Sequence, residues 1–476
     1  MLFAKIRLSA LLLTSLLAVN TQAQKLWSLD ECLHYALENN LSLKQNRLNI
    51  KQAEINFQEA KFARYPSLNG SVNNSYNFGR SIDPLTNANV QRNSANLRFG
   101  LSSGVVLFNG FQIHNSIQQQ RQLVYASLFD EQVAKNDIGM NIANAYLQVL
   151  FAKELVSINT ELLASTDLQL GRAEKYFEAG RVAESAVLDM KAQRANDNLS
   201  LVNAQNQELM ARVTLFQLLE LSPDSNDVLI PQVDFIPDAG IFNSGQLLSL
   251  YQNKAPELRA AEVRMEASNY GWKVAKGAYS PRLTLGADIG TLFSDQAVSP
   301  TYGQPMYYQQ YYDINGNPII QVPLANVTGT ETTPFGDQWN NNFGQTVALS
   351  LTIPIFNNYS TKAGVKRAEI GYQNAMLNKQ ITDLNITRDV TQAFNEYLAA
   401  KARYEATKVS FEAQEKSLEF AQKRFDALLL SDVEYRLVRN SWVSANSNLI
   451  QAKYELMFRY KIIEFYKNGT LYPEVR

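Results

Sequence analysis

The sequence contains little of what most enzymes and binding proteins use for chemistry. Its 476 residues include one cysteine and two histidines. A single cysteine excludes a disulfide framework and a cysteine-based structural zinc site. Two histidines leave little room for histidine-rich metal sites or acid–base catalysis. The 44 basic and 45 acidic residues also argue against a nucleic-acid-binding protein, which usually carries a basic excess or stripe.

Amides are abundant instead. The chain has 44 Asn and 34 Gln, whereas only 19% of its residues are charged. This composition suits a surface that is polar without strong electric fields. We read His34 and His114 as ordinary surface or packing residues, and we expect no catalytic residue, no cofactor and no bound metal.

The N-terminus predicts export. Residues 1–23 have a basic start, a short apolar run over 10–19 and small residues at the end, which is typical of a secretory signal peptide. Cys32 lies in a polar context well past the apolar run and is a poor lipidation site. No later stretch approaches 18 consecutive apolar residues. We therefore expect no transmembrane helix in the mature chain, so any membrane contact would be made by strands.

Prolines are missing from two long stretches, between residues 84 and 223 and between residues 354 and 473. Because proline breaks helix interiors, both gaps predict long helices. From Phe111 to Phe177 one continuous helix would hold about 67 residues and measure roughly 100 Å. No single globular core needs such a helix, so the sequence predicts a coiled coil or a helical tube. An apolar seam with heptad-like spacing agrees, at Phe129, Val133, Met140, Ala143, Leu147 and Leu150.

Four runs of alternating residues predict strands, at about 68–79, 95–108, 282–290 and 343–354. Each is about as long as a transmembrane strand and sets aliphatic residues against small or polar ones. A soluble sheet with one wet face fits the pattern equally well, and export favours the membrane. Four strands cannot close a barrel, and an open edge is not tolerated in lipid. Membrane strands here would therefore require several chains to share one barrel.

The chain also reads as an internal duplication. The segment Ala60–Leu68 matches Ala275–Leu283, and Leu107–Asn109 matches Ile355–Asn357. The second strand–strand loop, about 291–342, is the longer one and is rich in tyrosine and amides. We predict a first repeat over 24–222, a linker over 223–243 and a second repeat over 244–476.

These motifs, together with the hairpin sequence Tyr176–Ser185, resemble the TolC family of outer-membrane efflux proteins over about residues 27–470. The resemblance implies a mixed α and β membrane protein of two structural repeats. Three chains would form a 12-stranded barrel with four strands per chain, continued by a coiled-coil periplasmic tunnel. It implies a passive exit duct of a tripartite efflux or type I secretion system, not an enzyme, in the outer membrane of a Gram-negative bacterium. Its partners would be a periplasmic adaptor, an inner-membrane pump and outer-membrane lipid.

The resemblance also points to site residues and departs from the family there. An acidic entrance ring would be formed by Glu434, although Leu437 stands where the family has a second acid. The family's polar lock at the entrance cannot be built, because its positions match Ala186, Leu430 and Phe425. The hairpin tips are expected to contact an adaptor or one another, through Gly180, Arg181, Val182, Ala183, Leu428, Leu429, Leu430 and Ser431.

Two other classes fit part of the pattern. A general porin would have strands and no docking tunnel, and the long proline-free helices argue against it. A periplasmic coiled-coil scaffold or adaptor would be soluble, and the alternating strands argue against that. The sequence does not indicate whether the cargo is a drug, a metal or a polypeptide.

Overall fold

A computed structural model describes residues 27–82, 89–91, 93–221, 243–304, 306–427 and 429–471. The predicted signal peptide and nearly all of the predicted linker lie outside these residues. The chain divides into two units. Unit 1 comprises Met1–Ala53, Leu123–Met265 and Ala375–Arg476, and unit 2 comprises Glu54–Gln122 and Glu266–Asn374.

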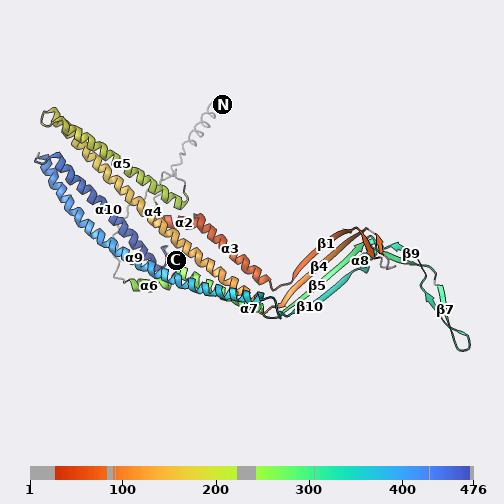
Figure 1. Cartoon of the computed structure of the whole chain (residues 1–476). Helices are drawn as coiled ribbons and strands as arrows, with labels where there is room; N and C mark the ends of the chain where they lie inside the picture. The colour runs from red at the N-terminus through yellow and green to blue at the C-terminus, as the bar shows by residue number, and fades with distance from the viewer. Residues whose placement is uncertain are drawn as a thin grey trace, which may run out of the picture. The chain divides into compact units, whose positions relative to one another are not determined.

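Four long helices pair as two hairpins, α4 with α5 and α9 with α10 (Figure 1). Both α4 and α9 are continuous over 67 residues, which confirms the helices predicted from the missing prolines. The helices are α2 (Leu29–Asn39), α3 (Leu41–Phe62), α4 (Gln112–Glu178), α5 (Glu184–Leu219), α6 (Ser244–Gln252), α7 (Pro256–Gly277), α8 (Phe335–Asn341), α9 (Ser360–Asp426) and α10 (Asp432–Asn468).

The helix bounds keep the offsets of the sequence motifs. Helix α9 begins and ends 248 residues after α4 (112 to 360, 178 to 426), and α7 begins and ends 215 residues after α3 (41 to 256, 62 to 277). Equivalent capping boxes start α2 and α6. In the first, the Ser28 backbone N–H donates to Glu31 Oε2 at 2.7 Å, and in the second the Gln246 N–H donates to Asn243 Oδ1 at 2.7 Å.

Unit 1 has two apolar cores of related construction. One packs α2 against α4, α5 and α10, and the other packs α6 against α9 and α10. Residues 248 apart fill equivalent places, as with the fully buried pair Ile142 and Val390 and the small residues Ala152 and Ala400. Because α4 and α9 bury equivalent positions on one face, the two long helices pack in equivalent ways.

Unit 2 is built around one antiparallel four-stranded sheet in the order β1-β4-β5-β10. Its strands are β1 (Ser67–Asn77), β4 (Ser94–Phe108), β5 (Arg282–Ser294) and β10 (Gly344–Thr352). They lie where the alternating runs predicted them. Strand β5 extends four residues beyond the predicted end at 290, because Ser294 still pairs with Asn96 of β4.

The register gives this sheet one apolar and one polar face. It sets Val72 beside Phe99, Leu101 beside Ile289 and Leu285 beside Leu349. The opposite face carries polar or small residues, among them Asn73, Arg98, Gly100, Ser102, Asp288, Gly290, Thr346 and Ser350. Within the described residues, β1 and β10 are edge strands, each with one neighbour.

The segment 291–342, expected as a loop, contains regular structure. It forms the two-stranded pairs β6 (Val298–Tyr302) with β9 (Val327–Thr332) and β7 (Met306–Tyr312) with β8 (Pro318–Leu324), in addition to α8. Helix α8 packs on the apolar face of the sheet, where Trp339 lies 5.0 Å from the ring of Phe99. Apolar and polar residues alternate only weakly in these short strands, which are rich in amides and tyrosines, so the sequence did not predict them. A further pair joins β2 (Arg80–Ile82) to β3 (Asn89–Gln91).

Two unusual turns connect strands to long helices in unit 2. Gly110 and Phe111 both have positive φ, at 65° and 63°, and so do Asn358 and Tyr359, at 52° and 66°. A Cβ at position 110 would lie 2.5 Å from the carbonyl oxygen of Gly277. Glycine is therefore required there both by backbone conformation and by the contact with the end of α7.

In the described part of the chain, no helix combines the length and the apolar character needed to cross a membrane.

Candidate functional site

The first hairpin tip connects α4 to α5 through residues 179–183. Helix α4 ends in a Schellman motif. The Arg181 N–H donates to the Tyr176 carbonyl at 2.8 Å, and the Gly180 N–H donates to the Phe177 carbonyl at 2.9 Å. Gly180 has a φ of 66°, which explains the glycine. Gly180, Arg181 and Ala183 are exposed, whereas Val182 is half-buried.

The second tip connects α9 to α10 and closes in a similar way. The Leu429 N–H donates to the Arg424 carbonyl at 2.8 Å, the same five-residue closure as in the first tip. Leu428, which matches Gly180, lies outside the described residues. Leu429 is 71% exposed, and Leu430 is half-buried. The predicted tip residues thus divide into exposed residues and residues that face inward.

Ser431 and Glu434 form a capping box at the start of α10. The Glu434 Oε2 accepts hydrogen bonds from the Ser431 hydroxyl at 2.7 Å and from the Ser431 backbone N–H at 3.0 Å. These two bonds, the hydroxyl first, lower the pKa of Glu434 below its ordinary value. The carboxylate is exposed and charged near neutral pH. Its ring role stays a prediction, and its observed contacts are those of a helix cap.

A cavity of about 610 Å³ lies between the two tips within unit 1. It brings together Ala186, Phe425 and Leu430, the three positions that the family resemblance matches to a polar lock. Its wall is largely apolar, and its polar members include Arg172 and Asp426, whose ion pair (Nη1 to Oδ1, 2.9 Å) links α4 to α9. The remaining lining residues are Gln169, Ala173, Lys175, Tyr176, Val182 and Met190.

Tyr435 packs beside this cavity and makes both aromatic and polar contacts. Its ring stacks on Phe425 with centroids 4.7 Å apart. Its hydroxyl accepts a hydrogen bond from Gln169 Nε2 at 3.0 Å and donates one to Gln422. Burial raises the pKa of Tyr435, so the phenol stays neutral. This residue connects α10 to both α4 and α9.

A buried ionic cluster lies further along α10. Arg439 donates from Nη2 to Asp197 Oδ2 at 2.7 Å and to the Leu162 carbonyl at 3.1 Å, and Thr166 donates to Asp197 Oδ2 at 2.5 Å. The side chains of Arg439 and Asp197 are only 4% and 6% exposed. Sequence reasoning missed this cluster. A signal existed, because Asp197 lies seven residues after Met190 and seven before Ala204, which are both buried.

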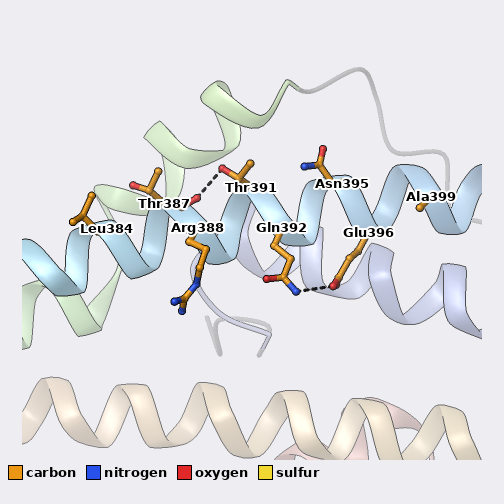
Figure 2. A pocket seen from close by; sticks show the side chains of 8 residues that line it. All are labelled: Leu384, Thr387, Arg388, Thr391, Gln392, Asn395, Glu396 and Ala399. Atoms are coloured by element: carbon orange, nitrogen blue, oxygen red, sulfur yellow. Dashed lines mark hydrogen bonds between the residues drawn. The ribbon is translucent and has the colours of Figure 1, made fainter.

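A shallow groove of about 660 Å³ runs along α9 (Figure 2). Thr391 and Asn395 lie along one side of it, and Gln392 donates to Glu396 at 2.8 Å along the other. Most lining residues are exposed in the single chain, and they recur every three or four positions on one helical face: Leu384, Thr387, Arg388, Thr391, Gln392, Asn395, Glu396 and Ala399. Four of these eight residues carry hydroxyls or amides, two are charged and two are apolar.

Within the residues that the structure describes, no group of three or more His, Cys, Asp or Glu side chains is placed to hold a metal ion. His34 and His114 are exposed on α2 and α4.

A sheet with one apolar and one polar face, in the same chain as two long helical hairpins, defines the class of outer-membrane ducts. The comparisons agree. The family described as "outer membrane efflux protein" matches residues 32–220 and 247–458. The outer membrane efflux protein BepC of Brucella suis is 20% identical, over 83% of this chain and 75% of its own. The pyoverdine export outer membrane protein OpmQ of Pseudomonas putida is 27% identical, over 45% of each chain.

Solved structures show the same fold. The outer membrane protein VceC of Vibrio cholerae superposes with a TM-score of 0.72 over 93% of this chain and 95% of its own, at 16% identity. The chain belongs to the outer membrane efflux protein family, and the resemblance to the TolC family is confirmed. It is an outer-membrane exit duct of an efflux system, with its helical part in the periplasm.

Proposed function

We propose that three copies of this chain assemble into one duct, each supplying four strands to a 12-stranded barrel and its long helices to a common tunnel. One observation carries the proposal: the sheet has an apolar face and two edge strands, β1 and β10. Unpaired edges are not tolerated in lipid, and four strands cannot close a barrel. Pairing β1 of one copy with β10 of the next removes every edge.

The transport step is passive. The polar strand face is built mainly from Asn, Ser, Thr and Gly, with Arg98 and Asp288 among them. The α9 groove presents hydroxyls and amides beside Arg388 and Glu396. These groups hydrate a passage without binding a solute tightly. The duct therefore needs energy from elsewhere, which fits a periplasmic adaptor and an inner-membrane transporter as partners. No residue in this proposal performs catalysis.

The hairpin tips are the docking end. Leu429 projects an apolar side chain into solvent, and Val182 and Leu430 line the cavity between the tips. An exposed leucine beside an apolar cavity suits the helical hairpin of an adaptor, whose apolar side chain could enter the cavity. Gly180, Arg181, Ala183 and Ser431 border this contact. The carboxylates of Glu434 from three copies would form a negative constriction that attracts cations.

Native mass spectrometry of the full-length protein in mild detergent tests the assembly. We expect a complex of three chains. A cysteine introduced on β1 at Asn73, combined with a scan of single cysteines along β10, should yield cross-links between copies. The native Cys32 is buried and should not react. A compact monomer, or the absence of any cross-link along β10, would contradict the shared barrel.

Docking is tested in cells that depend on this duct. We expect Leu429→Asp to abolish efflux and to remove photo-cross-links between the tip and the adaptor. Leu48→Asp is the matched control, because Leu48 on α3 is 62% exposed and far from the tips in sequence. Efflux by Leu429→Asp at the wild-type level would rule out the proposed tip contact. For Glu434, single-channel recordings of Glu434→Gln should show weaker cation preference and weaker block by multivalent cations. An unchanged recording would remove the ring role.

A further inference from the structure

The segments that join strands to helices carry charge of one sign. These four junctions, residues 60–68, 107–114, 273–283 and 354–368, contain no acidic residue, although the whole chain has 44 basic and 45 acidic residues. Their basic residues are Lys61, Arg64, Lys273, Lys276, Arg282, Lys362, Lys366 and Arg367. A surplus this local, in a chain balanced overall, calls for an anionic partner.

The strand register brings the four junctions to one rim of the sheet (Figure 1). Ser67 pairs with Gly104, Arg282 pairs with Thr352, and Leu283 lies opposite Phe108. The contact between Gly110 and Gly277 joins two of the junctions directly. We call this rim the junction belt. All of it lies within unit 2.

Exposed aromatic side chains share the belt. A bulge between Val106 and Phe108 places Phe108 opposite Leu283, on the apolar face of the sheet. Phe356 is 83% exposed. The other exposed aromatics of the belt are Phe62, Tyr65, Phe111, Tyr279 and Tyr359. A band of aromatics at the end of an apolar strand face marks the boundary between lipid tails and headgroups.

The cations of the belt are available to a partner. Lys61, Arg64, Lys276 and Lys362 are exposed, and none of these four forms an ion pair with another residue in the described part of the chain. Three of the ammonium groups lie over aromatic rings, Lys276 at 3.3 Å from Trp272, Lys61 at 4.4 Å from Phe57 and Lys362 at 5.4 Å from Tyr359. The aromatic rings thus hold these charged ends at the exposed surface without neutralising their charge.

Helix stability alone does not account for this charge. Lys61 and Lys276 lie in the last turns of α3 and α7, where the helix dipole favours cations. The starts of α4 and α9 favour acids, yet neither has an acid in its first turn, and Lys362 lies in the first turn of α9. A cation at that place opposes the dipole, so another interaction must favour it.

We propose that the junction belt binds the phosphate groups of anionic glycerophospholipids in the periplasmic leaflet of the outer membrane. The aromatics lie at the level of the ester groups, and Lys61, Arg64, Lys276 and Lys362 contact headgroup phosphates. The helical side of the sheet faces the periplasm, so the phospholipid leaflet is the source of these anions. This contact fixes the depth of the strands in the membrane, and it rests on the outer-membrane location, not on docking to an adaptor.

The test uses the purified full-length protein in detergent, titrated with phosphatidylglycerol or phosphatidylcholine and followed by native mass spectrometry. The variant carries Lys61→Gln, Arg64→Gln, Lys276→Gln and Lys362→Gln. We expect the wild type to retain phosphatidylglycerol over phosphatidylcholine and the variant to retain at least fivefold less phosphatidylglycerol. The control removes the same charge from exposed lysines elsewhere, through Lys51→Gln, Lys401→Gln, Lys408→Gln and Lys416→Gln.

Retention of phosphatidylglycerol by the variant at the wild-type level would overturn the proposal, and so would an equal loss in the control. Equal retention of the two lipids by the wild type would overturn it too. A second variant with Lys61→Arg, Lys276→Arg and Lys362→Arg should retain the lipid, which separates charge from misfolding. The same spectra report the number of chains. A wild-type trimer that does not retain phosphatidylglycerol would contradict only the belt, whereas a wild-type monomer would contradict the proposed assembly.

Discussion

The two helical hairpins share a backbone plan and differ in what they bury. The ionic cluster uses Thr166, Asp197 and Arg439. Positions 248 residues away in the other repeat hold Gln414, Ala445 and Lys191. Lys191 is not buried against an acid but pairs at the surface with Glu174, at 3.6 Å. The duplicated pattern of apolar residues therefore determines the path of the helices in both repeats, whereas the buried polar residues differ between the repeats.

The second helices of the two hairpins, α5 and α10, contribute differently to the contact between the hairpins. Helix α10 is tied by polar bonds to α4 and α5 through Arg439 and Tyr435, and it packs through apolar contacts on α6 and α9. Helix α5 contributes only the acidic partner, Asp197, to the same buried ion pair. We infer that α10 holds the second hairpin against the first.

The largest effect is expected from breaking the ionic cluster. Asp197→Leu leaves the buried charge of Arg439 without its carboxylate partner, which should destabilise the helical part by about 3–5 kcal/mol. Removing both charges in Asp197→Leu with Arg439→Met should recover most of this loss. Circular dichroism during chemical unfolding gives the free energies. Glu174→Ala, which breaks the equivalent surface pair, should cost no more than about 1 kcal/mol, and a similar cost for Asp197→Leu would refute the comparison.

An intermediate effect is expected at Tyr435. The equivalent residue of the first repeat is Val187, also buried, so Tyr435→Val makes the two hairpins alike. Loss of the stacking with Phe425 and of two hydrogen bonds should cost about 2–4 kcal/mol. Tyr435→Phe keeps the ring and should cost about 1 kcal/mol. Equal costs for the two variants in the same unfolding assay would mean that the ring contributes nothing.

A smaller effect is expected at the ion pair between the tips. Arg172 and Asp426 are 60% and 47% exposed, so Arg172→Gln should lower stability by at most about 1 kcal/mol at low salt. The difference should disappear near 1 M salt because exposed pairs are screened. Thermal unfolding at both salt concentrations measures it. A loss that persists at high salt would place the pair in a less exposed environment than the structure shows.

The smallest effect concerns the cap at Glu434 and depends on pH. The folded-state pKa of Glu434 is lowered, so its stabilisation is present above the unfolded pKa and is lost as pH falls through the folded pKa. Glu434→Gln should therefore unfold at a lower temperature than the wild type at neutral pH, and the two should converge as the pH falls below the folded-state pKa of Glu434. Glu184→Gln, at the start of α5 where Ala183 makes no side-chain cap, is the control. A difference that stays constant with pH would exclude the charged cap.

Sequence patterns predicted the features that depend on local or periodic properties. Missing prolines predicted the 67-residue helices, and alternation predicted the four strands. The ionic cluster escaped because Arg439 and Asp197 are 242 positions apart, and no local pattern pairs two such residues. At Glu434 the local pattern was the one missed. The family resemblance suggested a pore ring, which stays a prediction, but the capping box with Ser431 was not predicted.

The equal length of α4 and α9 sets a rule for how such chains can change. Both helices hold 67 residues and end at tips that meet around one cavity. A deletion of one residue in α4 would rotate everything beyond it by about 100° and shorten it by 1.5 Å, so the tips would no longer meet. Viable changes in length must come in steps of about seven residues and in all four long helices together. The two repeats must therefore gain or lose helical residues together, even though their side chains have diverged.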